Sequence, residues 1–315
     1  MSALQKVVVI GGNGFVGSAV CKAILAKGIK VTSVSSSGKP FTTPKGYSPA
    51  WTSNVDWQKG DALDPDSYAH HLPDATAVVH TLGTLIEGAK YKEALKEGNL
   101  ASLISSLASA LGSSNPLDAA DTKTSYATLN RDSVLRACET YISTKPSISL
   151  NKPRAFVHVS AEDIFRPWIP TNYIEMKREA ELGINEMVSG HPDLRAVHIR
   201  PSLIYHPHYR PLTSPLAAAL DISSVLHSKI PEGIPTPSGL LRAIASMSRS
   251  PSSPLPPAFD AIANALTIPP IHVDHVGKTI ATAADVERDD IRGVYGVREM
   301  RELMGWRSDS PVYSH

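Results

Sequence analysis

The sequence has few of the features that mark secreted, membrane-spanning or nucleic-acid-binding proteins. It contains two cysteines in 315 residues and has a formal net charge of +1. Two cysteines do not build a disulfide framework, and a balanced charge without a long basic run excludes nucleic acid as the expected partner. No apolar run approaches the roughly 20 residues of a membrane-spanning helix, and no secretory signal precedes the first expected strand.

Metal ligands are also missing from the pattern. Cys21 and Cys138 fall in segments with helical periodicity, where a free cysteine is typically a small core residue. The twelve histidines show no metal-ligand spacing, and the pair His206 and His208 flanks a proline in an expected surface turn. We therefore expect no metal site.

The most informative stretch follows an apolar run at residues 7–10. Three glycines satisfy the pattern G-x-G-x-x-G there, and residues 15–26 after them have helical spacing. Between a strand and a helix, such glycines allow a tight turn and close approach of a pyrophosphate, which the helix N-terminus then binds. The dinucleotide contacts predicted in this turn are Gly11, Gly12, Asn13, Gly14, Phe15, Val16 and Gly17.

Apolar strand-like runs alternate with helical segments through the first two thirds of the chain. The expected strands are residues 7–10, 30–34, 55–58, 77–80, 155–159 and 196–199. The expected helices are residues 15–26, 64–71, 90–96, 126–141 and 172–188. This alternation is typical of an α/β fold with a Rossmann-type, doubly wound parallel sheet.

The domain organisation follows from changes in composition. We expect residues 1–204 to form an NAD(P)-binding Rossmann domain, with a Ser/Ala/Leu-rich insertion at 98–124. Residues 205–270 are rich in proline and predict a small, irregular substrate or lid subdomain over the carboxyl edge of the sheet. Residues 271–315 are expected to return to the core as a strand and a helix, followed by a tail.

Apolar residues cluster at 215–226 and 240–247 within the proline-rich segment. Two alternatives stay open for these clusters. They form helices that pack on the sheet, or amphipathic helices that lie at a membrane interface.

The second strand runs into Ser35, Ser36, Ser37, Gly38 and Lys39, without the acidic residue that holds the ribose 2′-hydroxyl of NAD. Hydroxyls beside a lysine favour a 2′-phosphate, so NADP(H) is the preferred cofactor and NAD(H) the alternative. The same residues also suit an ordinary polar turn, and Asp61 fits either an adenine contact or a turn before a helix. The further predicted cofactor contacts are Ser35, Ser36, Lys39, Asp61, His80, Thr81, Leu82 and Gly83.

A candidate catalytic set lies near the fifth and sixth expected strands. Tyr173 and Lys177 are four residues apart and share one face of a helix, and Ser160 ends the strand before it. In a carbonyl reductase the tyrosine hydroxyl transfers a proton, and a nearby ammonium favours its phenolate form. The serine hydroxyl would hold the carbonyl oxygen during hydride transfer.

Spacing alone does not identify this set. Tyr141 and Lys145 are also four residues apart, but Tyr141 closes a helix before a strand, at the opposite end of the sheet. Asn130 is added as a fourth candidate with two alternatives. It orders a water or the catalytic lysine, or it only braces the backbone.

With these elements the chain resembles the short-chain dehydrogenase/reductase superfamily, in its atypical, extended branch. Residues 200–205, which begin with Arg200 and Pro201, are similar to an Arg-Pro segment after the sixth strand of that branch. Residues 271–276 are similar to its late strand before a helix. The resemblance adds four cofactor contacts to the prediction, namely Tyr173, Lys177, Arg200 and Pro201.

Four stretches, 11–15, 34–39, 79–83 followed by Tyr91 and Lys92, and 169–181, are similar to mitochondrial ubiquinone-biosynthesis proteins of fungi. A more distant similarity is to the NADPH-binding accessory subunit of respiratory complex I. The resemblance implies a mitochondrial protein on the matrix side of the inner membrane, with peripheral membrane contact, that works with coenzyme Q biosynthetic complex proteins.

Two functions remain. The favoured one is an NADP(H)-dependent oxidoreductase that acts on a quinone precursor or another lipid-like carbonyl or hydroxyl. The alternative is a non-catalytic, nucleotide-binding scaffold that stabilises or regulates the coenzyme Q complex.

Overall fold

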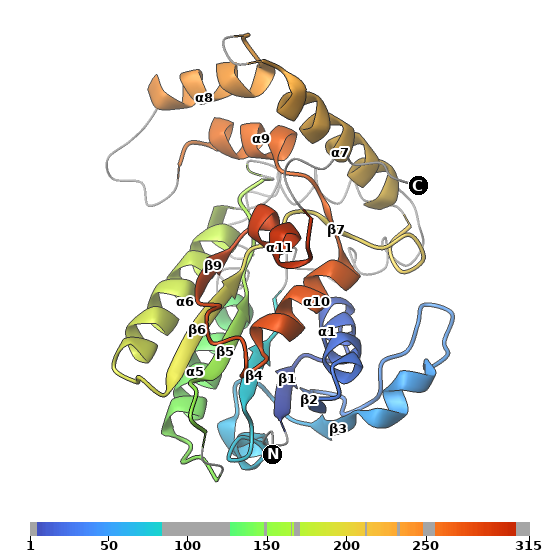
Figure 1. The fold of residues 1–315 in the computed structure, drawn as a ribbon, viewed down its shortest axis with the longest axis vertical. Coiled ribbons are helices and arrows are strands. Elements are labelled where there is room, and N and C mark those ends of the chain that lie inside the picture. The colour runs from blue at the N-terminus through green and yellow to red at the C-terminus, as the bar shows by residue number, and fades with distance from the viewer. Residues whose placement is uncertain are drawn as a thin grey trace, which may run out of the picture.

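The computed structural model describes residues 5–83, 127–147, 150–164, 166, 171–211, 213–231, 234–247 and 256–306. A parallel sheet of seven strands forms its centre, in the order β3-β2-β1-β4-β5-β6-β9 (Figure 1). The strands are β1 Lys6–Ile10, β2 Lys30–Ser35, β3 Asp56–Lys59, β4 Ala77–His80, β5 Arg154–Val159, β6 Leu194–Ile199 and β9 Gly293–Tyr295. The doubly wound α/β fold predicted from the sequence is confirmed.

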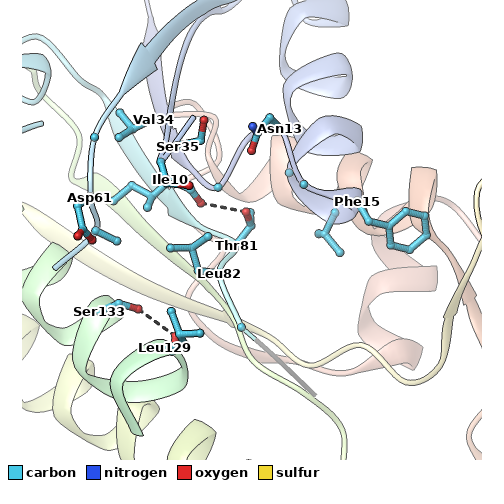
Figure 2. A pocket seen from close by; sticks show the side chains of 18 of the residues that line it. Ile10, Asn13, Phe15, Val34, Ser35, Asp61, Thr81, Leu82, Leu129 and Ser133 are labelled. Carbon is cyan, nitrogen blue, oxygen red and sulfur yellow. Dashed lines mark hydrogen bonds between the residues drawn. The ribbon is translucent and has the colours of Figure 1, made fainter. Parts of the chain in front are cut away.

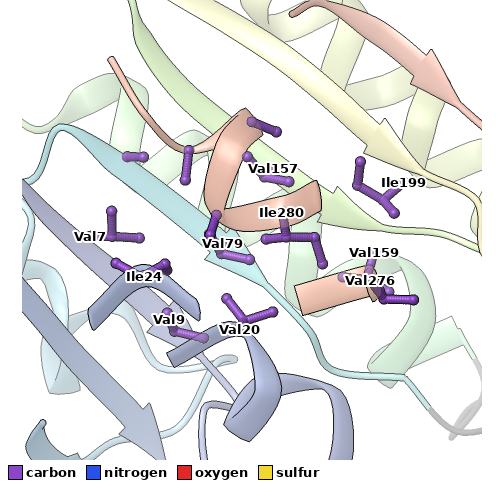
Figure 3. Packing of buried hydrophobic residues seen from close by; sticks show 14 of the residues in the cluster. Val7, Val9, Val20, Ile24, Val79, Val157, Val159, Ile199, Val276 and Ile280 are labelled. Carbon is purple, nitrogen blue, oxygen red and sulfur yellow. The ribbon is translucent and has the colours of Figure 1, made fainter. Parts of the chain in front are cut away.

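Helices cover both faces of the sheet because successive strand side chains point to opposite sides. On one face, Val7 and Val9 of β1 pack with α1 (Phe15–Ala26) and α10 (Val273–Ala283) (Figure 3). On the other face, Val8 and Ile10 pack with α5 (Ser133–Ser143) and α6 (Thr171–Ser189). Both faces of the central strands are therefore dry, as their continuous apolar runs require.

Most expected elements coincide with observed ones to within two residues. The exceptions are instructive. The helix expected at 64–71 is two short 3₁₀ turns, Pro65–Ser67 and Ala69–His71. The helix expected at 126–141 begins with a π turn at Thr128–Asp132 and continues as α5. The helix expected at 90–96 and the insertion at 98–124 lie outside the described residues.

The proline-rich segment is more regular than its composition predicts. Its described residues form α7 (Thr213–Lys229), α8 (Pro237–Met247) and α9 (Ala258–Thr267). Prolines do not break these helices because Pro237 is the first residue of α8 and Pro257 is the N-cap of α9, positions where no N–H is needed. Among the described helices, none combines the length and apolar composition needed to cross a membrane.

Helices α7, α8 and α9 form a layer beyond the carboxyl ends of the strands (Figure 1). The short strands β7 (Ile204–Tyr205) and β8 (Ile271–His272) pair at the entrance and exit of this layer. Asn264 of α9 donates to the carbonyl of Asp163 at 3.1 Å, and Arg301 of α11 (Val297–Leu303) pairs with Asp221 of α7 at 3.6 Å. Polar contacts therefore join the layer to the edge of the sheet.

Candidate dinucleotide site

The glycine-rich turn joins β1 to α1 at the carboxyl edge of the sheet. Gly11 has φ +88°, a conformation that favours glycine, and its N–H donates to the carbonyl of Val34 at 2.8 Å. A Cβ on Gly17 would lie 2.1 Å from the Gly11 carbonyl oxygen. Both glycines are therefore required for α1 to start directly against the turn.

A cleft of about 380 Å³ opens at this turn. Asp61 and Phe15 lie on opposite sides of the residues that line it, with Thr81 and Leu82 between them (Figure 2). The predicted contacts that line the cleft are Gly11, Asn13, Gly14, Phe15, Val16, Gly17, Ser35, Ser36, Asp61, Thr81, Leu82 and Gly83. The structure thus brings the ends of β1, β2, β3 and β4 to one cavity.

Side chains of the cleft hold its turns in place. Asn13 donates from Nδ2 to Ser37 Oγ at 2.9 Å, which ties the glycine turn to the end of β2. Thr81 donates from Oγ1 to the Ile10 carbonyl at 2.9 Å. Asp61 accepts the Leu63 N–H at 2.9 Å, which is a turn contact, and it also lines the cleft, so the adenine contact stays a prediction.

Several predicted cofactor residues do not line this cleft, namely Gly12, Lys39, His80, Tyr173, Lys177, Arg200 and Pro201. Gly12 faces the protein interior, because a Cβ there would lie 2.3 Å from Ser33 Oγ. His80 is buried and its Nε2 lies 3.1 Å from Ser133 Oγ. Lys39 is exposed beside the cleft, and its N–H donates to Ser37 Oγ at 3.2 Å.

Sequence reasoning missed eight lining residues, which are Ile10, Val34, Gly60, Ala62, Leu63, Leu129, Ser133 and Arg210. Ile10 and Val34 end the first two strands, so their position was available from the strand pattern. Arg210 has no such signal. It follows β7 in the chain, and its guanidinium carbon lies 4.0 Å from the centroid of the Phe15 ring.

The side chains of Lys177 and Asn130 meet beside Gly83, just after the end of β4. A Cβ on Gly83 would lie 2.9 Å from both Lys177 Nζ and Asn130 Oδ1. Lys177 Nζ donates to the carbonyls of Val159 at 2.9 Å and Leu82 at 3.3 Å. Burial lowers the pKa of Lys177 to about 7, against the opposing charge of Glu181.

Ser160 belongs to an ionic cluster in which the buried Glu181 carboxylate is shared by the half-buried Arg178 and Arg200. Its hydroxyl donates to Glu181 Oε1 at 2.5 Å and accepts from Arg178 Nη1 at 3.2 Å. Arg200 donates to both oxygens of the same carboxylate. Burial alone would raise the pKa of Glu181, but Arg200 and Arg178 outweigh it and leave this pKa below its ordinary value.

Tyr173 lies in the first turn of α6 and packs on a small apolar cluster of Ala161 and Ile174. The residue that the end of β5 contributes to this cluster is therefore Ala161, which has no hydroxyl. The motif residues Arg178 and Glu181 were not singled out from the sequence. Glu181 follows Lys177 by four residues on one helix face, and that spacing was the available signal.

Three buried histidines form a row across the sheet below the carboxyl edge. His80, His158 and His198 are register partners on β4, β5 and β6. Burial lowers the pKa of His80 to about 3 and that of His198 to about 4, so both are neutral at pH 7. Across the described residues, no group of three or more metal-ligating side chains is placed to hold an ion.

Comparison with known proteins agrees with this geometry. Residues 7–130 match the NAD dependent epimerase/dehydratase family. The chain is 34% identical over 211 residues to MIOREX complex component 2 of Saccharomyces cerevisiae, which covers 65% of this chain and 74% of the yeast protein. It is 27% identical over 300 residues to an uncharacterized chloroplastic protein of Arabidopsis thaliana, covering 95% of this chain and 77% of that protein.

Solved structures share the fold at low sequence identity. A 3-oxoacyl-[acyl-carrier protein] reductase from Brucella melitensis in complex with NAD has a TM-score of 0.55 at 11% identity, over 94% of this chain and 96% of that chain. Aldohexose dehydrogenase from Thermoplasma acidophilum has a TM-score of 0.54 at 14% identity, over 98% and 97% of the two chains. The chain therefore belongs to one family with its yeast relative, its residues 7–130 match the NAD dependent epimerase/dehydratase family, and its fold is the Rossmann type of these solved structures.

Proposed function

We propose that this chain is a nicotinamide-dinucleotide-binding protein of mitochondrial ubiquinone biosynthesis, and that it serves as the nucleotide-binding component of a multiprotein assembly. The cleft beside the glycine turn carries the proposal, since it joins the glycine turn and the N-terminus of α1 to the ends of β2 and β3. The name of the yeast relative, a complex component, supports an assembly role. The mitochondrial setting, on the matrix side of the inner membrane, rests on the sequence resemblance given above.

The assembly role is preferred because of how Ser160 and Ala161 lie. The Ser160 hydroxyl proton is donated to Glu181, so in this arrangement it does not hold a substrate oxygen. Ala161, which clusters with Tyr173, has no group that could replace it. A serine, tyrosine and lysine are present at the expected spacing, but Ser160 Oγ is engaged by Glu181 and Arg178, and Lys177 Nζ donates to the carbonyls of Val159 and Leu82.

The second candidate is an NADP(H)-dependent oxidoreductase acting on a quinone precursor or another lipid-like carbonyl or hydroxyl. The observation that favours it is the convergence of Lys177 and Asn130 on Gly83, which lines the cleft. A pKa of about 7 lets Lys177 exchange a proton near neutral pH. In this reading Tyr173 transfers a proton to the substrate while the bound nicotinamide supplies or accepts the hydride.

NADP(H) is the proposed nucleotide and NAD(H) is the alternative. Ser35 and Ser36 line the cleft at the end of β2, and Lys39 is the cation of the adjoining turn. Lys39→Gln should weaken NADP⁺ binding and leave NAD⁺ binding unchanged, as measured by isothermal titration calorimetry. Equal loss of both nucleotides would contradict a contact between Lys39 and the 2′-phosphate.

A peripheral membrane contact is proposed for the outer surface of α7 and α8. Leu240, Ile244 and Met247 form an exposed apolar stripe on α8, and Ile222 and Leu226 form another on α7. The only carboxylate of these two helices, Asp221, pairs with Arg301, while Lys229 and Arg242 are exposed cations. An apolar face flanked by cations fits an anionic bilayer surface.

The nucleotide proposal is tested by purifying the protein from mitochondria and identifying any released nucleotide by mass spectrometry. We expect NADP(H) in near-stoichiometric amount. Calorimetric titration of the nucleotide-free protein with all four nicotinamide dinucleotides then ranks their affinities. Absence of binding at millimolar concentration would remove the proposed function.

For the membrane contact, flotation with cardiolipin-containing vesicles should be lost in Leu240→Glu and retained in Leu182→Glu, which changes an exposed leucine on α6.

A further inference from the structure

Arg210 places a positive charge at the end of the cleft where α1 begins. Among the described residues that line the cleft, Arg210 is the one arginine or lysine. Its guanidinium lies over the ring of Phe15, which is the first residue of α1. The backbone N–H of Arg210 donates to the His206 carbonyl at 2.9 Å and closes the turn that leads into α7. A side chain from the C-terminal third of the protein thus reaches the glycine-rich turn.

We propose that Arg210 binds the pyrophosphate of the dinucleotide, an inference that rests on the proposed function. A dinucleotide pyrophosphate carries two negative charges, whereas a helix N-terminus supplies only about half an elementary charge. The glycine turn adds N–H donors without a full charge. A guanidinium adds a full charge and a planar pair of donors that matches phosphate oxygens. The Phe15 ring supports the guanidinium through a cation–π contact.

The position of Arg210 assigns it to the pyrophosphate rather than to a 2′-phosphate. The 2′-phosphate is expected beside Ser35 and Lys39, after β2, whereas the pyrophosphate is expected at the start of α1. Asp61, on the adenosine side of the cleft, lies on the opposite side from Phe15 (Figure 2). Lys39 and Arg210 therefore serve two different phosphate groups.

This contact links nucleotide binding to the outer layer of helices. Arg210 precedes the first residue of α7, Thr213, whose N–H donates to the Arg210 carbonyl at 3.0 Å. A bound pyrophosphate that holds Arg210 also holds the start of α7. Because such coupling is reciprocal, the layer that carries the exposed apolar stripes should be more stable when the cleft is occupied.

The test compares Arg210→Gln with Arg242→Gln, a control that removes an exposed arginine of α8 whose Nη2 donates to Asn264 Oδ1 at 3.0 Å. Calorimetry is run with NADP⁺ and with NAD⁺. Loss of a charge-assisted hydrogen bond should weaken both nucleotides by about 10-fold to 100-fold in Arg210→Gln, with no change in the control. Hydrogen exchange of the α7 amides should slow when NADP⁺ is added to the wild type, and much less in Arg210→Gln.

Each result decides between the two proposals. If the wild type binds nucleotide and Arg210→Gln binds it within twofold of the same affinity, the role of Arg210 is overturned and the proposed function stands. Loss of NADP⁺ affinity alone overturns the role of Arg210 too, because the arginine would then contact the 2′-phosphate. Absence of binding by the wild type removes both. Arg210→Lys, which keeps the charge without the planar fork, should bind with intermediate affinity and decides the matter if the glutamine variant does not fold.

Discussion

The two halves of the carboxyl edge of the sheet use their polar groups differently. On the β1 and β2 side, glycine backbone and small hydroxyls face an open cleft of about 380 Å³. On the β5 and β6 side, Ser160, Arg178 and Arg200 all bond to the buried carboxylate of Glu181. The difference shows that a sequence motif determines where residues lie along the carboxyl edge of the sheet. Their hydrogen-bond and ion-pair partners in the fold determine whether they are available to a ligand.

The strongest test of the closed half is Glu181→Leu. This change leaves Arg178 and Arg200 without their shared carboxylate, and breaking a buried ion pair costs about 3–5 kcal/mol. We expect a loss of that size in urea unfolding, with nucleotide affinity retained in the folded fraction. Glu186→Leu, an exposed glutamate on the same helix, should change stability by about 0.5 kcal/mol or less. Similar stabilities for the two variants would show that the cluster contributes nothing.

The row of buried histidines that crosses both halves should make the fold sensitive to acid. His80 and His198 have folded-state pKa values of about 3 and about 4, below an ordinary value of 6.5. Between the folded-state pKa and 6.5, the unfolded chain binds more protons than the folded chain. The free energy of unfolding therefore falls as pH drops from 6.5 towards 4. Acidification from pH 7 to pH 4 should therefore cost roughly 3 kcal/mol per histidine.

The measurement is urea unfolding at pH 7 and pH 4 for the wild type and for His198→Leu. The variant removes one titrating group and should lose less stability on acidification. At pH 7 the variant also loses the contact between His198 Nε2 and Asn185 Oδ1 at 2.9 Å and the edge contact with the His158 ring. Parallel pH profiles for both proteins would mean that folding does not lower the pKa of His198.

The open half is tested by Gly14→Trp. A Cβ on Gly14 meets only the Gly11 carbonyl oxygen, at 3.2 Å, and Gly14 lines the cleft, so the indole should take the space of the pyrophosphate. We expect nucleotide affinity to fall by more than about 100-fold, equivalent to about 2.7 kcal/mol. Gly190→Trp is the matched control, because a Cβ on Gly190 meets nothing within 4 Å. Unchanged affinity in Gly14→Trp would place the ligand elsewhere.

The fold and the open half were largely predictable from the sequence, because they depend on local signals. Buried strands appear as continuous apolar runs, and the glycine turn is confined to Gly11–Gly17. Arg210 was not predictable, since its contact with Phe15 joins residues far apart in the chain. Helices α7 and α8 were expected from the apolar clusters at 215–226 and 240–247, whereas α9 was missed because the prolines before it were interpreted as a mark of irregular structure.

The closed half was predictable only in its spacing. Ser160 and Ala161 are adjacent at the end of β5, and which of them clusters with Tyr173 depends on where the strand ends and how α6 packs on it. That choice is made by tertiary packing. The same spacing of serine, tyrosine and lysine is therefore compatible with an active triad and with the ionic cluster observed.

Tyr173→Phe carries the smallest expected effect and separates the two candidate functions. Removing one hydroxyl from a partly buried ring outside the cleft should leave nucleotide affinity within about twofold, or roughly 0.4 kcal/mol. If the chain acts as a nucleotide-binding component, cells that carry only this variant should keep normal ubiquinone levels, whereas cells with Gly14→Trp should not. Loss of ubiquinone in Tyr173→Phe, with folding and nucleotide binding intact, would instead make the phenol a catalytic group and the chain an oxidoreductase.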